Sequence, residues 1–376
     1  MRSAAPFGIP APALFLVAAA TLAEMVPPLG ETPLGAVQHV VSFALIIILF
    51  DGGMHIGRRR FGESAVPILW LGTAGTAVTA AALGILCHLA FGFSWQPALL
   101  LGAALAATDP AVVFSVLGKR EITGRTGTIL EGESGANDPV GIALTIALLS
   151  TTGAGADAWL QGCRIFAVQM VVGLVVGVVG GRVLLAFMRH VRLPRPSFNA
   201  VQVFAGAVAL FILATVLHGS GFLAVFAAGV LVGDEPAPFK VTIVRFHSVL
   251  ASLGEIVAFT ILGLTVPISE LTHRDVWLTG LGIGALLILV VRPVLVGLLS
   301  WPIDLRRGER AFILWAGLKG AVPILLGSFA LTAGAPDATR IYGVIFFVVT
   351  LSVIVQGGSV PAAAKTLGVP MKRVRS

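Results

Sequence analysis

Apolar residues run along this chain in stretches long enough to cross a bilayer, separated by short polar segments that hold most of the charges. A transmembrane helix needs about 17–25 predominantly apolar residues. The pattern predicts helices at about 11–27, 38–56, 65–91, 97–117, 126–150, 161–187, 199–217, 221–233 (a short one), 247–267, 275–300, 310–332 and 341–363. The predicted fold class is therefore an all-α polytopic membrane protein of about twelve helices, with one integral membrane domain over residues 1–376 and no soluble regulatory domain.

The composition agrees with a membrane protein and excludes an ordinary soluble domain. Of 376 residues, 57% are apolar and only 11% are charged, with a mean hydropathy of +0.97. That is too little polar surface to face water. The two cysteines, Cys87 and Cys163, form neither a metal motif nor a disulfide framework. In such a chain the net charge of +7 reports membrane topology, so we do not expect nucleic acid as a partner.

The basic residues predict the orientation of the helices. If Met1 is cytoplasmic, the segments on the cytoplasmic side carry Arg2; Arg58, Arg59 and Arg60; Lys119, Arg120 and Arg125; Arg182, Arg189, Arg192 and Arg195; Lys240 and Arg245; Arg306, Arg307 and Arg310; and Lys365, Lys372, Arg373 and Arg375. The other side carries only Arg164, Arg274 and Arg340. This positive-inside bias predicts a multi-pass protein of the cell inner membrane or plasma membrane with both termini in the cytoplasm.

Two of the predicted helices contain residues that interrupt a helix near its middle. The helix over 97–117 contains Ala107-Thr108-Asp109-Pro110, and the helix over 310–332 contains Gly317-Leu318-Lys319-Gly320-Ala321-Val322-Pro323. Proline lacks the amide hydrogen that an intact helix uses. The two interrupted helices are seven helices apart, so they run in opposite directions, as in inverted-repeat transporters with a binding site at the membrane midplane.

The charged residues at these breaks match the dipoles of the half-helices. Helix N-termini are positive and C-termini negative, so we expect Asp109 to face N-terminal ends and Lys319 to face C-terminal ends. The alternative interpretation is that Thr108-Asp109-Pro110 forms a turn in a loop and that Lys319 reaches the membrane interface.

A third polar stretch, Glu133-Ser134-Gly135-Ala136-Asn137-Asp138, lies inside the predicted helix over 126–150. Glu133 and Arg292 should reach a similar depth, so an ion pair between them explains both charges. Asp138 is then left without a cation of its own, as a cation- and proton-binding acid requires, and Ser134 and Asn137 supply further oxygens. Asp51 lies near the cytoplasmic end of its helix and is a weaker candidate for the ion path.

At these residues the chain resembles the monovalent cation/proton antiporters of the cation:proton antiporter-1 family, in its NhaP-type and cell-volume-regulation potassium/proton branch. The matching motifs, in order, are Phe50-Asp51-Gly52-Gly53, Ala107-Thr108-Asp109-Pro110, Glu133-Ser134-Gly135-Ala136-Asn137-Asp138, Gly219-Ser220-Gly221-Phe222-Leu223-Ala224-Val225, Gly317-Leu318-Lys319-Gly320-Ala321-Val322-Pro323 and Gln356-Gly357-Gly358. They span nearly the whole chain.

The resemblance implies an NhaA-like fold with the cation and proton site at Asp138, Asn137, Ser134, Thr108 and Asp109, and with Glu133 and Arg292 as a structural pair. An Asn before Asp138 resembles the electroneutral branch. It further implies a homodimer in which core helices (about 65–150 and 275–363) move against dimer or scaffold helices. Three departures stand out: one N-terminal helix fewer than usual, Lys319 where Arg is usual, and no nucleotide-sensing domain after the membrane part.

These observations favour a secondary active antiporter that exchanges Na⁺ or K⁺ for H⁺, with no cofactor and no enzymatic activity. The two ligands would compete for Asp138. The alternatives are an uncoupled cation channel with the same buried charges and a non-transporting membrane subunit or sensor. The choice among Na⁺, K⁺ and Li⁺ depends on oxygen placement at sub-ångström scale, which a sequence does not give.

Overall fold

The computed structural model describes residues 10–117, 120–151, 155–191, 194–266, 268 and 274–373, and these residues are almost entirely helical. In chain order the elements are α1 (Ala11–Met25), α2 (Pro27–Gly30), α3 (Leu34–Glu63), α4 (Ala65–Leu69), η1 (Trp70–Gly75), α5 (Thr76–Phe91), α6 (Trp95–Ala106), α7 (Pro110–Leu117), β1 (Arg120–Ile122), α8 (Arg125–Ser150), α9 (Ala156–His190), α10 (Pro196–Val216), α11 (Gly221–Gly233), α12 (Lys240–Leu264), α14 (Arg274–Leu286), η2 (Leu287–Val291), α15 (Arg292–Leu299), α16 (Arg307–Trp315), α17 (Ala321–Thr332), α18 (Ala338–Leu351), η3 (Ser352–Gly357), α19 (Gly358–Thr366) and β2 (Met371–Arg373).

The all-α membrane fold class is confirmed. Among the described residues, seven helices are long and apolar enough to cross a membrane: Leu34–Glu63, Ala65–Phe91, Ala156–His190, Ser197–Val216, Lys240–Leu264, Asp275–Leu299 and Ala338–Thr366. Shorter apolar helices are α1, α6, α11 and α17. The boundaries differ from the sequence prediction mainly at the C-terminal end of α3, which continues to Glu63, at both ends of α9, and at the start of α12, which begins at Lys240. Of the basic residues used to predict the orientation, Arg2, Lys119, Arg192 and Arg375 lie outside the described residues.

Both predicted interruptions are present. One expected helix is divided into α6 and α7 with residues 107–109 between them, and another into α16 and α17 with residues 316–320 between them. The helix before each broken helix contains a π segment, η1 and η2 respectively. A π segment changes the direction of a helix locally, so the side chains that follow it point in a different direction. Arg292 directly follows η2.

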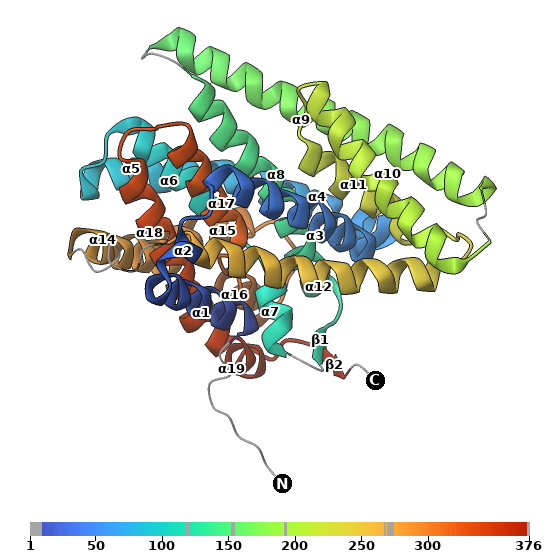
Figure 1. Cartoon of the computed structure of the whole chain (residues 1–376). Helices are drawn as coiled ribbons and strands as arrows, with labels where there is room; N and C mark the ends of the chain where they lie inside the picture. Colours follow the sequence, from blue (N-terminus) through green and yellow to red (C-terminus); the bar gives the residue numbers. More distant parts are fainter. Residues whose placement is uncertain are drawn as a thin grey trace.

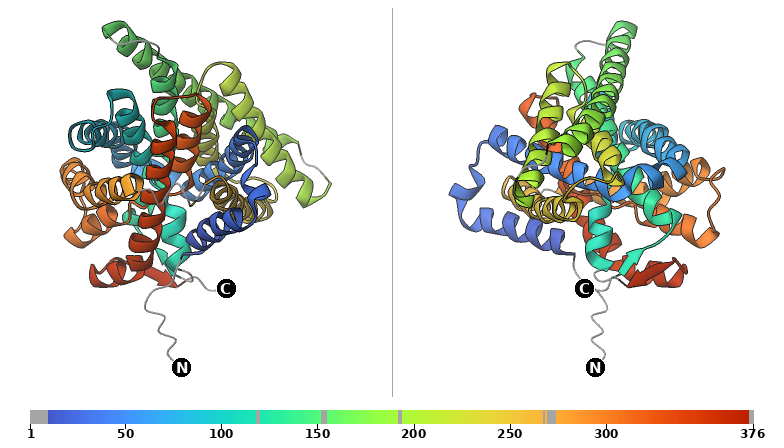
Figure 2. Two further views of the ribbon diagram at one scale, coloured as in Figure 1. Left: turned by 60° about the vertical axis from the view of Figure 1, so that its left-hand side comes forward. Right: turned by 90° about the vertical axis from the view of Figure 1, so that its right-hand side faces the viewer.

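The helices pack as two groups (Figures 1 and 2). The α3 group contains α1 to α3 and α9 to α12, in which α11 packs on α3 and α9, and α12 packs on α1 and α3. The broken-helix group contains α4 to α8 and α14 to α19, in which α5 packs on α6, and α18 packs on α14 and α17. Helix α8 contacts helices of both groups, so its residues lie where the groups meet.

Close backbone approach joins α9 to α11. A methyl group built at Gly173, Gly177 or Gly181 would overlap Ser220, Ala224 and Ala228 respectively, all on or next to α11. The spacing of four residues puts these glycines on one face of α9. The glycine-rich run of α9 therefore serves helix packing, which membrane helices achieve through small residues.

The two ends of the bundle can be named by the elements found there. β1 pairs antiparallel with β2, and this strand pair lies at the bottom of the view in Figure 1. We call this end the β1–β2 end. The loop between α17 and α18 lies at the opposite end, which we call the α17–α18 end. Helix α3 starts at the α17–α18 end and runs toward the β1–β2 end, whereas α8 runs the other way.

Candidate functional site

The two helix breaks contact each other through their backbones. The Asp109 amide nitrogen donates to the Leu318 carbonyl oxygen at 2.8 Å. Non-helical backbone at membrane depth must find partners inside the protein, and this hydrogen bond gives one such partner to each break. The contact brings the C-terminal end of α6 and the N-terminal end of α17 to one point.

Lys319 lies at the C-terminal end of α6. Its side chain is 2% exposed, and its Nζ donates to the carbonyl oxygens of Ala107 at 2.9 Å and Ala106 at 3.4 Å. Its own backbone amide donates to Ser352 Oγ at 3.1 Å. The ammonium group therefore meets the negative end of a half-helix.

Asp109 takes the complementary position at the start of α17. Its carboxylate lies directly against the α carbon of Gly320, since a methyl group built at that glycine would overlap the Asp109 carboxylate. Gly320 immediately precedes α17. A carboxylate beside the first turn of a helix is stabilised by the unpaired amide groups there.

Helix α8 carries Glu133 in contact with Arg292. The Arg292 Nη2 atom is 3.0 Å from Glu133 Oε1, and both side chains are about 5% exposed or less. Arg292 also donates to carbonyl oxygens at the end of α16, from Nε to Leu314 at 3.1 Å and from Nη2 to Ile313 at 3.2 Å. The guanidinium thus joins α8 to the C-terminal end of a half-helix, a second contact that the sequence did not indicate.

Three further predicted site residues form a hydrogen-bonded unit around the first break. Asn137 Nδ2 donates to Thr108 Oγ1 at 2.7 Å, and the Thr108 amide donates to Asn137 Oδ1 at 3.3 Å. Ser134 Oγ donates to the Thr108 carbonyl oxygen at 2.6 Å. The sequence interpretation treated Asn137 and Ser134 as oxygen ligands. Here the Asn137 amide accepts from the Thr108 backbone and donates to the Thr108 side chain, so α8 fixes the shape of the break.

Asp138 follows this unit on α8 and is 7% exposed. The charges that act on its carboxylate are those of Asp109 and Lys319. No salt bridge to Asp138 occurs among the residues that the structure describes. The crossing therefore gathers three carboxylates (Asp109, Glu133 and Asp138) and two cations (Arg292 and Lys319) in one buried region. The carboxylates outnumber the cations, and a bound proton or monovalent cation would reduce the excess negative charge.

Asp51 belongs to a different constellation, nearer the β1–β2 end. Its Oδ1 accepts from Ser248 Oγ at 3.1 Å, and its Oδ2 lies 3.3 Å from His55 Nδ1. The side chain of His55 is 48% exposed, and Glu131 is close enough for its charge to act on this histidine. These polar groups line one end of the bundle and do not join the crossing.

Glu255 is a residue whose position the sequence did not reveal. It lies on α12, and its carboxylate interacts electrostatically with that of Asp109 in the other helix group. Its Oε1 is buried and accepts no hydrogen bond from the described part of the chain. The sequence pattern suggests only a helix-end acid, because nothing in the order of residues indicates that α12 packs beside the crossing.

A buried carboxylate beside two crossing half-helix pairs, inside a polytopic helical bundle, is typical of membrane transport proteins of the inverted-repeat class. Comparison with known proteins identifies the family. A model of the family described as "Sodium/hydrogen exchanger, transmembrane" matches residues 1–366, and the chain belongs to this family.

Several curated proteins are similar to this chain. The K⁺/H⁺ antiporter NhaP of Alkalimonas amylolytica is 38% identical over 348 residues, covering 90% of this chain and 60% of that protein. The K⁺/H⁺ antiporter NhaP2 of Shewanella oneidensis is 36% identical over 330 residues, covering 87% and 57%. The Na⁺/H⁺ antiporter NhaH of Halobacillus dabanensis is 27% identical over 346 residues, covering 88% and 83%. The chain thus spans about 60% of the length of the first two.

A solved structure shows the same fold. The sodium proton antiporter MjNhaP1 from Methanocaldococcus jannaschii at pH 8 superposes with a TM-score of 0.77 at 22% identity, covering 93% of each chain. Since that identity is low, the likeness concerns the fold. It agrees with the predicted all-α polytopic fold.

Proposed function

We propose that this protein is a secondary active antiporter that exchanges a monovalent cation, Na⁺ or K⁺, for H⁺ by alternating access. The observation that carries the proposal is the excess of carboxylates over cations among the described residues at the crossing, where Asp109, Glu133 and Asp138 lie with Arg292 and Lys319 and Glu255 interacts with Asp109. Binding a proton or a cation reduces this excess negative charge. The names of the relatives from Alkalimonas amylolytica and Halobacillus dabanensis agree with this chemistry.

Asp138 is the residue that binds the proton or the cation in this proposal. Glu133 is engaged by Arg292, and Asp109 lies at the start of α17. Asp138 is the remaining acid, and Thr108, Ser134 and Asn137 hold the adjacent break in shape. Because the proton and the cation neutralise the same carboxylate, only one of them is carried at a time. One ion then exchanges for one proton, and the cycle is electroneutral.

The two helix groups supply the moving parts. The broken-helix group corresponds to the mobile core, and the α3 group corresponds to the scaffold and dimerisation domain. Support comes from α9, whose Val171, Val175, Val179 and Val183 are exposed apolar residues on the outer side of the α3 group. A second copy of the chain or lipid would cover such a face. The distribution of basic residues supports an orientation in the inner or plasma membrane with the β1–β2 end in the cytoplasm.

A proteoliposome assay with a pH-sensitive dye tests the function. An imposed pH gradient is challenged with Na⁺, K⁺ or Li⁺ at several pH values, and membrane current is recorded in parallel. We expect at least one cation to dissipate the pH gradient at a rate that saturates with cation concentration, with no membrane current. Current without coupled proton movement would identify an uncoupled channel, and no response to any alkali cation would identify a non-transporting subunit or sensor.

A further inference from the structure

Two hydrogen-bonded contacts join the helix groups at the α17–α18 end. Gln38 on α3 donates from Nε2 to Thr332 Oγ1 at 2.7 Å, to the Ser328 carbonyl oxygen at 2.9 Å and to Ser328 Oγ at 3.2 Å. At the end of α12, Thr265 Oγ1 lies 2.5 Å from the hydroxyl of Tyr342 on α18. In both cases one partner belongs to the α3 group and the other to the broken-helix group.

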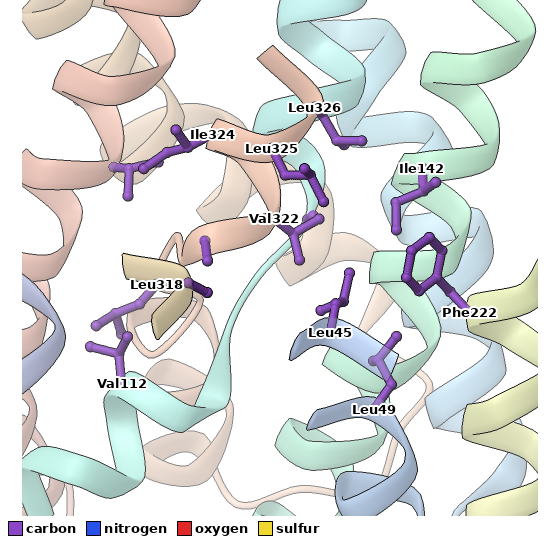
Figure 3. Packing of buried hydrophobic residues seen from close by; sticks show 14 of the residues in the cluster. Leu45, Leu49, Val112, Ile142, Phe222, Leu318, Val322, Ile324, Leu325 and Leu326 are labelled. Carbon is purple, nitrogen blue, oxygen red and sulfur yellow. The ribbon is translucent and has the colours of Figure 1, made fainter. Parts of the chain in front are cut away.

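Buried apolar residues of both helix groups pack together in the cluster drawn in Figure 3. Leu45 and Phe222 of the α3 group pack near Ile142 and Leu326 of the broken-helix group, and all four are buried in the same cluster. Ile142 is one helical turn beyond Asp138 in the direction of the α17–α18 end. Water and ions therefore meet an apolar barrier between Asp138 and that end.

Polar side chains lie toward the opposite end of the bundle. Asp51, His55 and Ser248 contact one another there, and the His55 side chain is half exposed. The charge of Glu131 also acts on this group. Hydrated ions approach such a polar group much more easily than an apolar layer.

The contacts at the α17–α18 end are suited to break and reform. Each serine or threonine hydroxyl in them has an acceptor within its own segment: Ser328 Oγ donates to the Leu325 carbonyl at 2.6 Å, Thr332 Oγ1 to the Ser328 carbonyl at 3.1 Å, and Thr265 Oγ1 to the Leu262 carbonyl at 2.8 Å. When the groups separate, only the Gln38 amide and the Tyr342 hydroxyl lose their partners. Both would then face the opened end, where water can replace those partners.

We propose that Gln38 and the Thr265–Tyr342 pair form a latch that holds the α17–α18 end closed, so that this structure presents the site toward the β1–β2 end. The inference rests on the proposed alternating access, since it names the contacts that must break when the site opens to the other side. Weakening the latch shifts the population toward the state open at the α17–α18 end.

Thiol labelling tests the latch independently of transport. A reporter cysteine is introduced by Leu326→Cys in a Cys163→Ser background, in which the remaining native thiol, Cys87, is buried. The protein in lipid nanodiscs is treated with a membrane-impermeant thiosulfonate. Gln38→Leu and Tyr342→Phe should each raise the labelling rate about 3- to 10-fold, the population shift that loss of one such hydrogen bond produces.

Thr265→Val removes the other partner of the Tyr342 hydroxyl and should raise the labelling rate in the same way. Thr260→Val is its matched control, because Thr260 lies on α12 and its hydroxyl donates to Ile256 of the same helix. The control should label like the parent. Unchanged labelling rates in folded Gln38→Leu and Tyr342→Phe would overturn the latch.

A second readout needs no engineered cysteine. Tyr342 is the single tyrosine of the chain and is 4% exposed, so its nitration by tetranitromethane should be slow in the parent and faster in Gln38→Leu. Equal nitration rates would also contradict the proposal. If the rates change while the parent moves no protons in proteoliposomes, the latch stands and the antiport function fails.

Discussion

The ammonium nitrogen of Lys319, on the break between α16 and α17, lies 2.9 Å from the carbonyl oxygen of Ala107, on the break between α6 and α7. The ammonium group of one broken helix thus caps the C-terminal end of a half-helix of the other. Asp109 makes the reverse connection, because its carboxylate lies against Gly320 at the start of α17. The two side chains stabilise the crossing from opposite directions.

Removing the Lys319 charge should disrupt the crossing. Lys319→Met leaves the buried carbonyl groups of Ala106 and Ala107 without a donor, at a cost of about 1–3 kcal/mol for each unsatisfied group. We expect a lower temperature of thermal unfolding and at least a tenfold loss of cation-driven proton movement. Lys319→Arg should retain much of the transport, since it keeps the charge. Lys365→Met, at an exposed position of α19, is the control, and equal effects of the two Met variants would refute the role of Lys319.

The Glu133–Arg292 pair predicts a stability effect. Arg292→Met leaves Glu133 buried without its cation, which costs about 3–5 kcal/mol for a buried pair. Arg292→Lys should lose less stability but should not restore it fully, because one ammonium cannot replace the guanidinium contacts to both Glu133 and the α16 carbonyls.

Thermal unfolding in detergent measures this effect. The comparison is Arg59→Met, which breaks the pair of Arg59 with Glu63, whose side chains are 85% and 66% exposed. An exposed pair contributes about 0–1 kcal/mol. An Arg292→Met protein as stable as Arg59→Met would show that the buried pair is not structural.

The close approach at Gly320 predicts a steric effect. A Cβ atom at this position overlaps the Asp109 carboxylate, so Gly320→Ala should push Asp109 away from α17. Overpacking of this kind costs about 1–3 kcal/mol, and transport should fall with it. Gly35→Ala is the matched control, since no atom lies within 4 Å of the added carbon there. Transport by Gly320→Ala at the level of Gly35→Ala would contradict the observed geometry.

Much of this arrangement could be predicted from the sequence, because the informative residues are helix breakers or charged groups, whose placement inside a membrane helix costs free energy. Pro110 at mid-span indicates a broken helix without any tertiary information. Lys319, as a cation near the middle of a membrane helix, must find a negative partner, and a half-helix end is one. Glu133 and Arg292 could be paired because both charges need a partner at similar depth.

The remaining contacts depend on packing that sequence order does not encode. Arg292 reaches the carbonyl groups of Ile313 and Leu314 because α15 packs against α16. Glu255 interacts with Asp109 because α12 packs against α17. The Gln38 contact joins residues about 290 positions apart in the chain. No local sequence pattern predicts such long-range contacts.

Competition at Asp138 predicts how transport depends on pH. As pH falls, protons occupy the carboxylate more often, so more cation is needed to reach half-maximal exchange. The apparent KM for the cation should rise with decreasing pH, by up to about tenfold per pH unit, the limit for one proton at one site. The maximal rate at saturating cation should change much less. A KM independent of pH over several units would show that the two ions use separate sites.

The central claim is that Asp138 carries the exchanged ion, and Asp138→Asn tests it most directly. The asparagine keeps the size of the side chain but holds no charge and releases no proton in this range. Dissipation of a pH gradient by Na⁺, K⁺ and Li⁺ is measured in proteoliposomes, with Asp157→Asn in the exposed first turn of α9 as the matched control. We predict no cation-driven proton movement by folded Asp138→Asn and parental activity for Asp157→Asn. Cation/proton exchange retained by Asp138→Asn would contradict the mechanism.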